Sequence, residues 1–195
     1  MKTAREYAGS GRFFRDVKNE DWFFENVNFC AKNRLIDGTS KAEFSPQEKL
    51  TRAVLVKALY RLEGEPAPAK ATSFDDVVPD SEFADAISWA KENAIVNGIN
   101  EREFAPESNI TREQIAAIMY RYATFKGYPA SDFVNTDISR FSDAKDVSAY
   151  AELAMRYVVG SGLINGKTEH TLNPKDNITR AEISAVLERF IKKHL

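Results

Sequence analysis

Apolar side chains recur at helical spacing in two stretches near the middle of the chain. The first stretch contains Phe83, Ile87, Ala90 and Ala94, and the second contains Ile115, Ile118, Met119 and Tyr122. Because an α-helix turns once in about 3.6 residues, steps of three and four residues place each set on one helix face. Strand-like alternation of useful length is absent from the sequence, so the pattern predicts an all-α fold.

This helix–loop–helix pattern occurs three times along the chain. Each copy opens on a Phe-x-Asp motif, reaches an Asx-Gly pair about 22 residues later, and has an arginine 14 residues after that glycine. The landmarks are Phe14, Phe74 and Phe141, then Gly38, Gly98 and Gly166, and then Arg52, Arg112 and Arg180. Intervals kept three times indicate tandem repeats. One repeat has roughly 55 residues, near the lower limit for independent stability, so we expect the three to share a core.

Two segments rich in Pro, Gly and small residues separate the repeats. We assign residues 13–64, 73–127 and 140–195 to the repeats, 65–72 and 128–139 to linkers, and 1–12 to an N-terminal tail. The tail is polar and lacks the apolar stretch of a signal peptide. If the protein works outside the cell, we expect its export signal to lie elsewhere.

Helix boundaries are marked by local signals in each repeat. In the second repeat, Asn97 and Gly98 tolerate positive φ, so the pair predicts the end of the first helix. Thr111 is a favourable N-cap for the second helix, and Gln114 three residues later completes a capping box. The third repeat has the same box in Thr179 and Glu182. In the first repeat Val54 replaces the Glu or Gln, and we expect a cap weaker by about 0.5–1 kcal/mol.

The arginine of each repeat follows a predicted N-cap threonine and so takes the first helical position. Unpaired backbone N–H groups and the positive end of the helix dipole lie beside that position. A helix start of this kind favours anion binding, and a guanidinium group there can add two parallel hydrogen bonds to a carboxylate. In the alternative, structural interpretation, each arginine pairs with a neighbouring repeat or with a Phe-x-Asp aspartate: Asp16, Asp76 or Asp143. A surface ion pair contributes only about 0–1 kcal/mol, so the threefold repetition favours anion binding.

Two further residue types recur in the repeats. Aromatic residues cluster on the first helix of each repeat, namely Trp22, Phe29, Trp89, Tyr150 and Tyr157. We interpret them mainly as core, although an aromatic side chain at the edge of a groove can stack on a sugar ring. A second set of arginines, nine residues after the first, consists of Arg61, Arg121 and Arg189. We interpret these as solvated or as ion-paired between repeats.

Composition and motifs exclude several function classes. The net charge is −2 and no basic stripe is available, which argues against a nucleic-acid binder. No apolar run approaches the roughly 20 residues that span a bilayer, and the single cysteine, Cys30, rules out an internal disulfide framework. Metal-ligand clusters, P-loops and the motifs H-E-x-x-H and G-x-S-x-G are absent. We therefore expect no metal, no cofactor and no enzymatic activity.

Three sets of motifs resemble the S-layer homology (SLH) family: FRDV…LIDG…FSPQEKLTRAV, FDDV…IVNG…FAPESNITREQ and FSDA…LINGK…LNPKDNITRAE. The match covers roughly residues 13–195. The resemblance implies a pseudo-threefold, three-pronged spindle of helix–loop–helix repeats around a central helical bundle. It also implies grooves between neighbouring repeats that hold secondary cell-wall polymers, commonly with a pyruvylated sugar.

In this family such grooves attach surface proteins non-covalently to the bacterial envelope, so we expect the protein at the cell surface or cell wall. The arginine of the Thr-Arg-Ala-Glu motif is the family's main contact to the acidic group of the ligand. Carried over by position, that role falls to Arg52, Arg112 and Arg180. Groove-lining partners implied by the same motifs are Asp16, Asp76, Asp143, Gly38, Gly98 and Gly166.

Departures from the family pattern predict that the grooves are unequal. The first repeat reads Thr-Arg-Ala-Val and the second Thr-Arg-Glu-Gln. The glycine often found four residues before the Asx-Gly glycine is present as Gly162 but is replaced by Arg34 and Ala94. Our hypothesis is a monomeric anchoring module that binds an acidic or pyruvylated wall polysaccharide. The alternatives are a helical-repeat scaffold for another protein and, less favoured, an unrecognised hydrolase.

Overall fold

The computed structural model describes residues 14–194, and the predicted tail of residues 1–12 lies outside them. The described residues form six α-helices: α1 (Phe24–Lys32), α2 (Arg52–Leu62), α3 (Ala84–Glu92), α4 (Arg112–Phe125), α5 (Glu152–Gly160) and α6 (Arg180–His194). Three short 3-10 helices are η2 (Ala130–Phe133), η3 (Ala144–Asp146) and η4 (Ala149–Ala151). No helix within residues 14–194 is long and apolar enough to cross a bilayer. The predicted all-α fold is confirmed.

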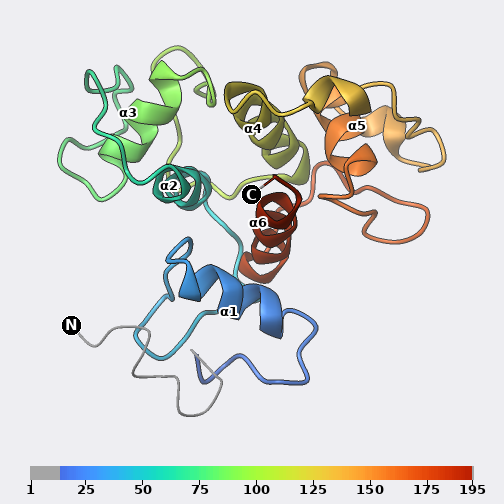
Figure 1. Cartoon of the computed structure of the whole chain (residues 1–195). Coiled ribbons are helices and arrows are strands. Elements are labelled where there is room, and N and C mark those ends of the chain that lie inside the picture. The colour runs from blue at the N-terminus through green and yellow to red at the C-terminus, as the bar shows by residue number, and fades with distance from the viewer. Residues whose placement is uncertain (1–13, 195) are drawn as a thin grey trace.

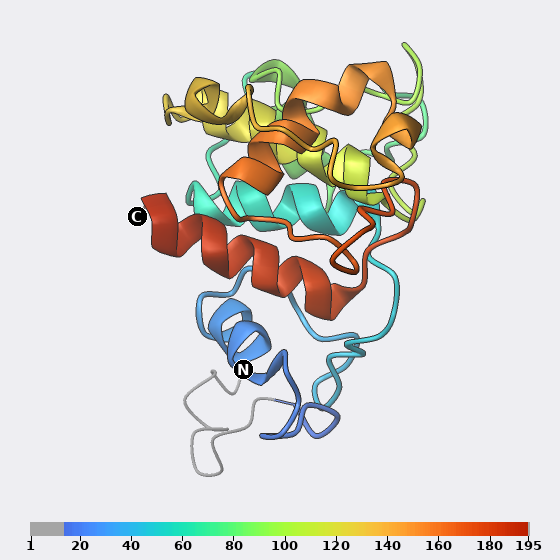
Figure 2. The same ribbon diagram turned by 90° about the vertical axis from the view of Figure 1, so that its right-hand side faces the viewer.

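The second helix of each repeat lies at the centre of the molecule. Figure 1 shows α2, α4 and α6 grouped around the middle, with α1, α3 and α5 outside them as three lobes. Seen from the side, the three central helices run next to one another along a common direction (Figure 2). The expected three-pronged arrangement around a central bundle is therefore confirmed.

Each prong is built from two different repeats. The outer helix α3 packs on α2, and α5 packs on α4, so an outer helix contacts the central helix of the preceding repeat. The circle closes because α1, from the first repeat, packs on α6 from the third. Buried apolar residues of all three repeats accordingly form one continuous cluster. This arrangement explains why a single repeat lacks a core of its own.

A ring of backbone hydrogen bonds joins the repeats where the central helices begin. Leu50 N–H donates to the carbonyl of Ile178 at 3.0 Å, and Ile110 N–H donates to the carbonyl of Leu50 at 3.0 Å. Ile178 N–H completes the ring by donating to the carbonyl of Ile110 at 3.1 Å. All three residues are fully buried, so their polar backbone groups need these partners.

The capping boxes predicted for the second and third repeats are confirmed, and the first repeat lacks one as expected. Thr111 Oγ1 accepts the backbone N–H of Gln114, and Gln114 Oε1 accepts that of Thr111. The same reciprocal pair forms between Thr179 and Glu182. Thr51 makes no such side-chain bond, and its buried Oγ1 has no partner among the described residues. The predicted stripe of the second helix is also buried throughout.

The prediction that Asn97-Gly98 ends the first helix through positive φ is wrong. Helix α3 ends at Glu92, and the left-handed residue after it is Ala94, with φ of 55°. Ala94 is exposed and does not belong to the apolar stripe. The reason for Gly98 is steric: a Cβ there would lie 2.1 Å from the Asn100 carbonyl oxygen. The glycine therefore permits a close approach within the loop, not an unusual backbone dihedral.

Candidate functional site

The arginine at the start of each central helix reaches into the loop of the next repeat. Arg52 Nε donates to the carbonyl of Phe104 at 2.9 Å, and its Nη2 donates to the carbonyl of Asn97 at 3.2 Å. The other two follow the same pattern: Arg112 binds the carbonyls of Leu172 and Asn165, and Arg180 binds those of Phe44 and Asp37. Each arginine thus ties two neighbouring repeats together, as the structural interpretation predicted.

The first two N–H groups of each central helix are paired, which corrects the prediction of unpaired N–H groups there. Arg52 N–H donates to the Ser108 carbonyl and Ala53 N–H to the Pro106 carbonyl, each at 3.0 Å. Equivalent bonds from the next repeat close the starts of α4 and α6. Because the helix starts are buried between repeats, each N–H needs a protein partner. Only the guanidinium charge therefore remains available for an anion.

That charge is buried without a carboxylate partner. Arg52 and Arg112 are each 5% exposed and Arg180 is 6% exposed. Within residues 14–194 none of the three forms an ion pair, and their Nη1 groups have no recorded hydrogen-bond acceptor. Burial lowers the pKa of all three groups below the ordinary value, although an arginine stays charged at neutral pH. A buried cation of this kind favours an anion beside it, because buried charges are stabilised by pairing.

The three aspartates of the Phe-x-Asp motifs brace the loops that receive the arginines. Asp76 accepts the backbone N–H groups of Phe104 and Ala105 at 2.9 and 2.6 Å. Asp16 holds Phe44 and Ser45, and Asp143 holds Leu172 and Asn173, in the same way. The second residue of each pair has positive φ, between 51° and 59°. The structure therefore places Asp16, Asp76 and Asp143 beneath the loops, outside the linings of the two grooves described next.

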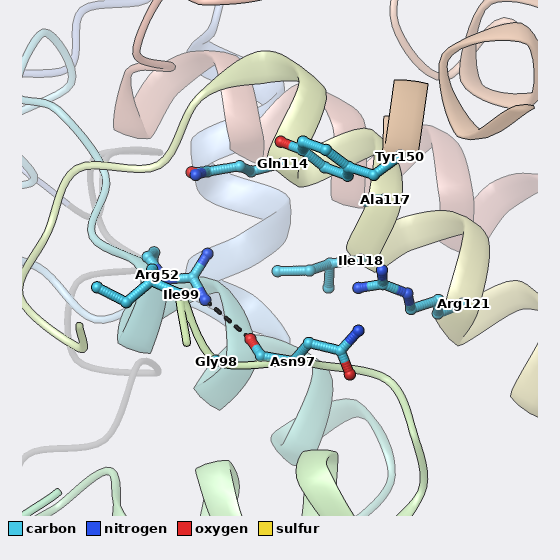
Figure 3. Close-up of a pocket in the computed structure, with 9 residues that line it drawn as sticks. All are labelled: Arg52, Asn97, Gly98, Ile99, Gln114, Ala117, Ile118, Arg121 and Tyr150. Carbon is cyan, nitrogen blue, oxygen red and sulfur yellow. Dashed lines mark hydrogen bonds between the residues drawn. The ribbon is translucent and has the colours of Figure 1, made fainter. Parts of the chain in front are cut away.

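The first groove, which we call groove A, receives side chains from all three repeats. It has a volume of about 370 Å³ and is lined by Arg52, Asn97, Gly98, Ile99, Gln114, Ala117, Ile118, Arg121 and Tyr150. Figure 3 shows Arg52 and Arg121 at opposite ends, with Ile118 between them. Tyr150 and the loop of Asn97 and Gly98 form the two sides. Groove A therefore combines two cationic ends with an apolar floor and an aromatic wall.

A second groove, groove B, repeats this layout one step around the molecule. Its volume is about 310 Å³, and its lining includes Trp22, Arg112, Asn165, Gly166, Lys167, Glu182, Ala185, Val186 and Arg189. The arginine, Asx-Gly and second arginine positions match those of groove A, and Trp22 stands where groove A has Tyr150. Gly98 and Gly166 thus line grooves as expected.

The third set of equivalent positions, around Arg180 and in the first repeat, is spanned by internal ion pairs, and we call it groove C by analogy with the other two. Lys57 stands where grooves A and B have alanine, and it forms an ion pair with Glu82, which takes the place of the aromatic wall. Asp37 replaces the asparagine, and its carboxylate lies 2.8 Å from Arg61 and 3.9 Å from Lys57. Gly38 belongs to this loop, where a Cβ would lie 2.5 Å from the Glu43 carbonyl oxygen. The ion pairs of Lys57 and Arg61 therefore make groove C different from grooves A and B, in line with the predicted inequality.

Sequence reasoning missed two kinds of groove residue. Trp22 and Tyr150 are 63% and 55% exposed, whereas Trp89 and Tyr157 are buried as expected and Phe29 is half-buried. The second arginines, Arg121 and Arg189, line grooves A and B, whereas Arg61 forms ion pairs. Their recurrence nine residues after the first arginines was the available signal. No set of His, Cys, Asp and Glu within residues 14–194 is arranged to hold a metal ion.

Comparison with known proteins identifies the family. The S-layer homology domain matches residues 13–53, 73–116 and 140–183, and the chain belongs to the S-layer homology family. It is 31% identical over 193 residues to an endoglucanase of Bacillus sp. (strain KSM-635), covering 92% of this chain and 19% of that enzyme. It is also 32% identical over 178 residues to the surface-layer 125 kDa protein of Lysinibacillus sphaericus, covering 86% of this chain and 14% of that protein.

A cellulosome-anchoring protein of Acetivibrio thermocellus is 26% identical over 155 residues, covering 77% of this chain and 34% of that protein. The chain thus spans about a third or less of each of these relatives. Membership in the family makes it an anchoring module of the cell surface and cell wall. The catalytic activity of the endoglucanase belongs to that protein and does not transfer to this chain.

Proposed function

We propose that the chain anchors its parent protein non-covalently by binding an anionic cell-wall polysaccharide in grooves A and B. The observation that carries the proposal is the pair of buried guanidinium groups, Arg52 and Arg112, each bound only to backbone carbonyls at the end of a groove. A ligand carboxylate, such as that of a pyruvate ketal, would pair with these guanidinium groups, which form no ion pair within residues 14–194. In groove B, the lining carboxylate of Glu182 is itself paired with Lys167.

The rest of each groove suits a sugar. A charge-assisted hydrogen bond from arginine to a carboxylate contributes about 1.5–3 kcal/mol, and Arg121 and Arg189 offer a second cation at the far end. The exposed rings of Tyr150 and Trp22 provide flat apolar surfaces that can pack on a sugar ring. One groove gives modest affinity, but two grooves on one polymer gain avidity.

Groove C is assigned no ligand in this proposal. A ligand carboxylate entering there would compete with Asp37 and Glu82 for Lys57 and Arg61. Groove B has one ion pair among its lining residues, Lys167 with Glu182, whereas groove C has three that join Lys57 and Arg61 to Asp37 and Glu82. A ligand in groove C would therefore have more ion pairs to break. The module therefore presents two working sites.

The test compares binding to purified wall polymer before and after the acidic ketal is removed. The variants are Arg121→Ala and Arg189→Ala, alone and together, because these side chains line the grooves without joining neighbouring repeats as Arg52 and Arg112 do. Each single variant weakens binding, and the double variant abolishes it while the melting temperature is retained. Binding that ignores the ketal, or a double variant that binds normally, would contradict the proposal and favour a protein-binding scaffold.

A further inference from the structure

A polar cluster beside groove A has no equivalent in the other two repeats. Its centre is Glu113, which is 5% exposed and follows Arg52's counterpart Arg112 in the first turn of α4. The matching positions in the first and third repeats are Ala53 and Ala181. A buried carboxylate is costly unless it is well paired, so its partners indicate what it does.

All the partners of Glu113 come from the third repeat. Ser148 donates both its backbone N–H and its hydroxyl to the carboxylate, each at 3.0 Å. Lys175 Nζ lies 2.7 and 2.8 Å from the two oxygens. Tyr150 donates its hydroxyl at 3.1 Å. Glu113 therefore fixes a short segment that consists of Ser148 and η4. This segment carries Tyr150, the aromatic wall of groove A.

We propose that Glu113 is a positioning residue for ligand binding, which holds the Tyr150 ring in place as the wall of groove A. This inference rests on the proposed function of that groove. The Tyr150 hydroxyl donates its hydrogen bond to Glu113, so the face of the ring is the part available to the ligand. Trp22 in groove B makes an edge-to-face contact with the neighbouring Phe23, with ring centroids 5.3 Å apart. The aromatic wall of groove A is therefore held by a hydrogen bond from Tyr150 to Glu113, which we call the clamp, whereas the wall of groove B is held by the ring contact of Trp22 with Phe23.

Holding a side chain before the ligand arrives removes an ordering cost from binding. Immobilising one such side chain costs about 0.5–1.5 kcal/mol on association. Loss of the clamp is therefore expected to weaken binding in groove A by about three- to tenfold. Binding in groove B should not change.

The first experiment isolates groove A by placing every variant in a Trp22→Ala, Arg189→Ala background. In it, Tyr150→Phe weakens binding of purified wall polymer, and Glu113→Ala weakens it at least as much, because it also releases Ser148 and Lys175. The double variant is no weaker than Glu113→Ala alone, because that substitution already removes the hydrogen bond to Tyr150. Equal binding by the background protein and its folded Glu113→Ala variant would overturn the clamp. A background protein that binds no polymer would instead overturn the proposed function of groove A.

A matched control is available at the opposite end of α4. Glu63 also accepts a tyrosine hydroxyl, from Tyr122, and a lysine, Lys126, but it lies away from the grooves. Glu63→Ala should lower the melting temperature and leave the affinity of groove A unchanged. If it weakened binding as much as Glu113→Ala does, the effect would be general destabilisation and the clamp would be wrong.

A ligand-free measurement tests the contact itself. Burial and the Glu113 carboxylate raise the pKa of the Tyr150 phenol to about 12. Nuclear magnetic resonance of ring-labelled tyrosine, with the Tyr150 signal identified from Tyr150→Phe, should show this pKa fall in Glu113→Ala. An unchanged pKa would mean that Glu113 does not hold the hydroxyl.

Discussion

Arg180 at the start of the last helix donates a 2.7 Å hydrogen bond from Nε to the carbonyl of Phe44 in the first repeat. The guanidinium group also lies over the Phe44 ring, 4.6 Å from its centroid. This contact closes the circle of repeats, because it joins the end of the chain to its beginning. The same kind of side chain that we propose to face the ligand in grooves A and B is therefore also a structural link.

Arg180→Ala should destabilise the fold. The buried carbonyl of Phe44 and the part-buried carbonyl of Asp37 lose a charged donor, and we expect the free energy of unfolding to fall by about 2–4 kcal/mol. Urea unfolding followed by circular dichroism measures the loss. Arg180→Lys should recover only part of it, since lysine lacks the planar fork that reaches both carbonyls. A melting temperature unchanged by Arg180→Ala would show that the link contributes little.

Replacing Ala94 by glycine should stabilise the protein. Ala94 has φ of 55°, a left-handed conformation that costs a residue with a Cβ about 1 kcal/mol or more. Gly162 occupies the matching position in the third repeat without that cost. We expect Ala94→Gly to raise the free energy of unfolding by about 1 kcal/mol. Ala90→Gly, inside α3, is the control and should destabilise. A loss of stability in Ala94→Gly would contradict the explanation from backbone strain.

Groove C should become a binding site when its ion pairs are removed. The substitutions Lys57→Ala and Glu82→Tyr, made together with Asp37→Asn to remove the pair with Arg61, reproduce the residues of groove A at these three positions. If the proposed function holds, isothermal titration with a short acidic fragment of the polymer should show the stoichiometry rise from two to three per chain. Lys57→Ala alone keeps the Glu82 carboxylate and should leave the stoichiometry unchanged. A triple variant that still binds two fragments would show that the ion pairs are not what closes groove C.

Stability should fall in acid, in part through Glu113. Burial acts to raise the pKa of this carboxyl group, but hydrogen bonds from Lys175, Ser148 and Tyr150 outweigh it and lower the pKa below the ordinary 4.5. Such a group stabilises the fold above its unfolded-state pKa, and the contribution is lost as the pH falls through the lower folded-state value.

The free energy of unfolding should therefore decline below about pH 4.5. Glu113→Ala should make that decline shallower, and Lys175→Ala should give an intermediate slope. Urea unfolding at a series of pH values measures all three curves. If the curves for the parent protein and Glu113→Ala were parallel, Glu113 would not contribute to the loss of stability in acid.

The parts of the fold that depend on nearby residues were predictable from sequence. The Thr111 and Gln114 capping box lies within one helical turn, so its spacing alone was enough. The three repeats were equally visible, because tandem copies keep their intervals. Gly98 was predicted to matter but for the wrong reason, since the atoms that a Cβ would strike belong to a loop whose path the sequence does not specify.

The groove walls were harder to predict because each comes from another repeat. Trp22 lies beside Arg112 and Arg189 only because α1 packs on α6, a contact between the two ends of the sequence. Nothing in the local pattern distinguishes this exposed tryptophan from the buried Trp89 one repeat later. The placement of the second arginines in the grooves has the same origin.

The ring formed by Leu50, Ile110 and Ile178 also limits how the protein can evolve by duplication. An open solenoid can lengthen at either end, since its terminal units keep free faces for another copy. Here every unit already uses both its donor and its acceptor within a closed circle of three. A fourth copy could not join without opening that circle, so multiplying the sites requires another complete triplet in the same chain.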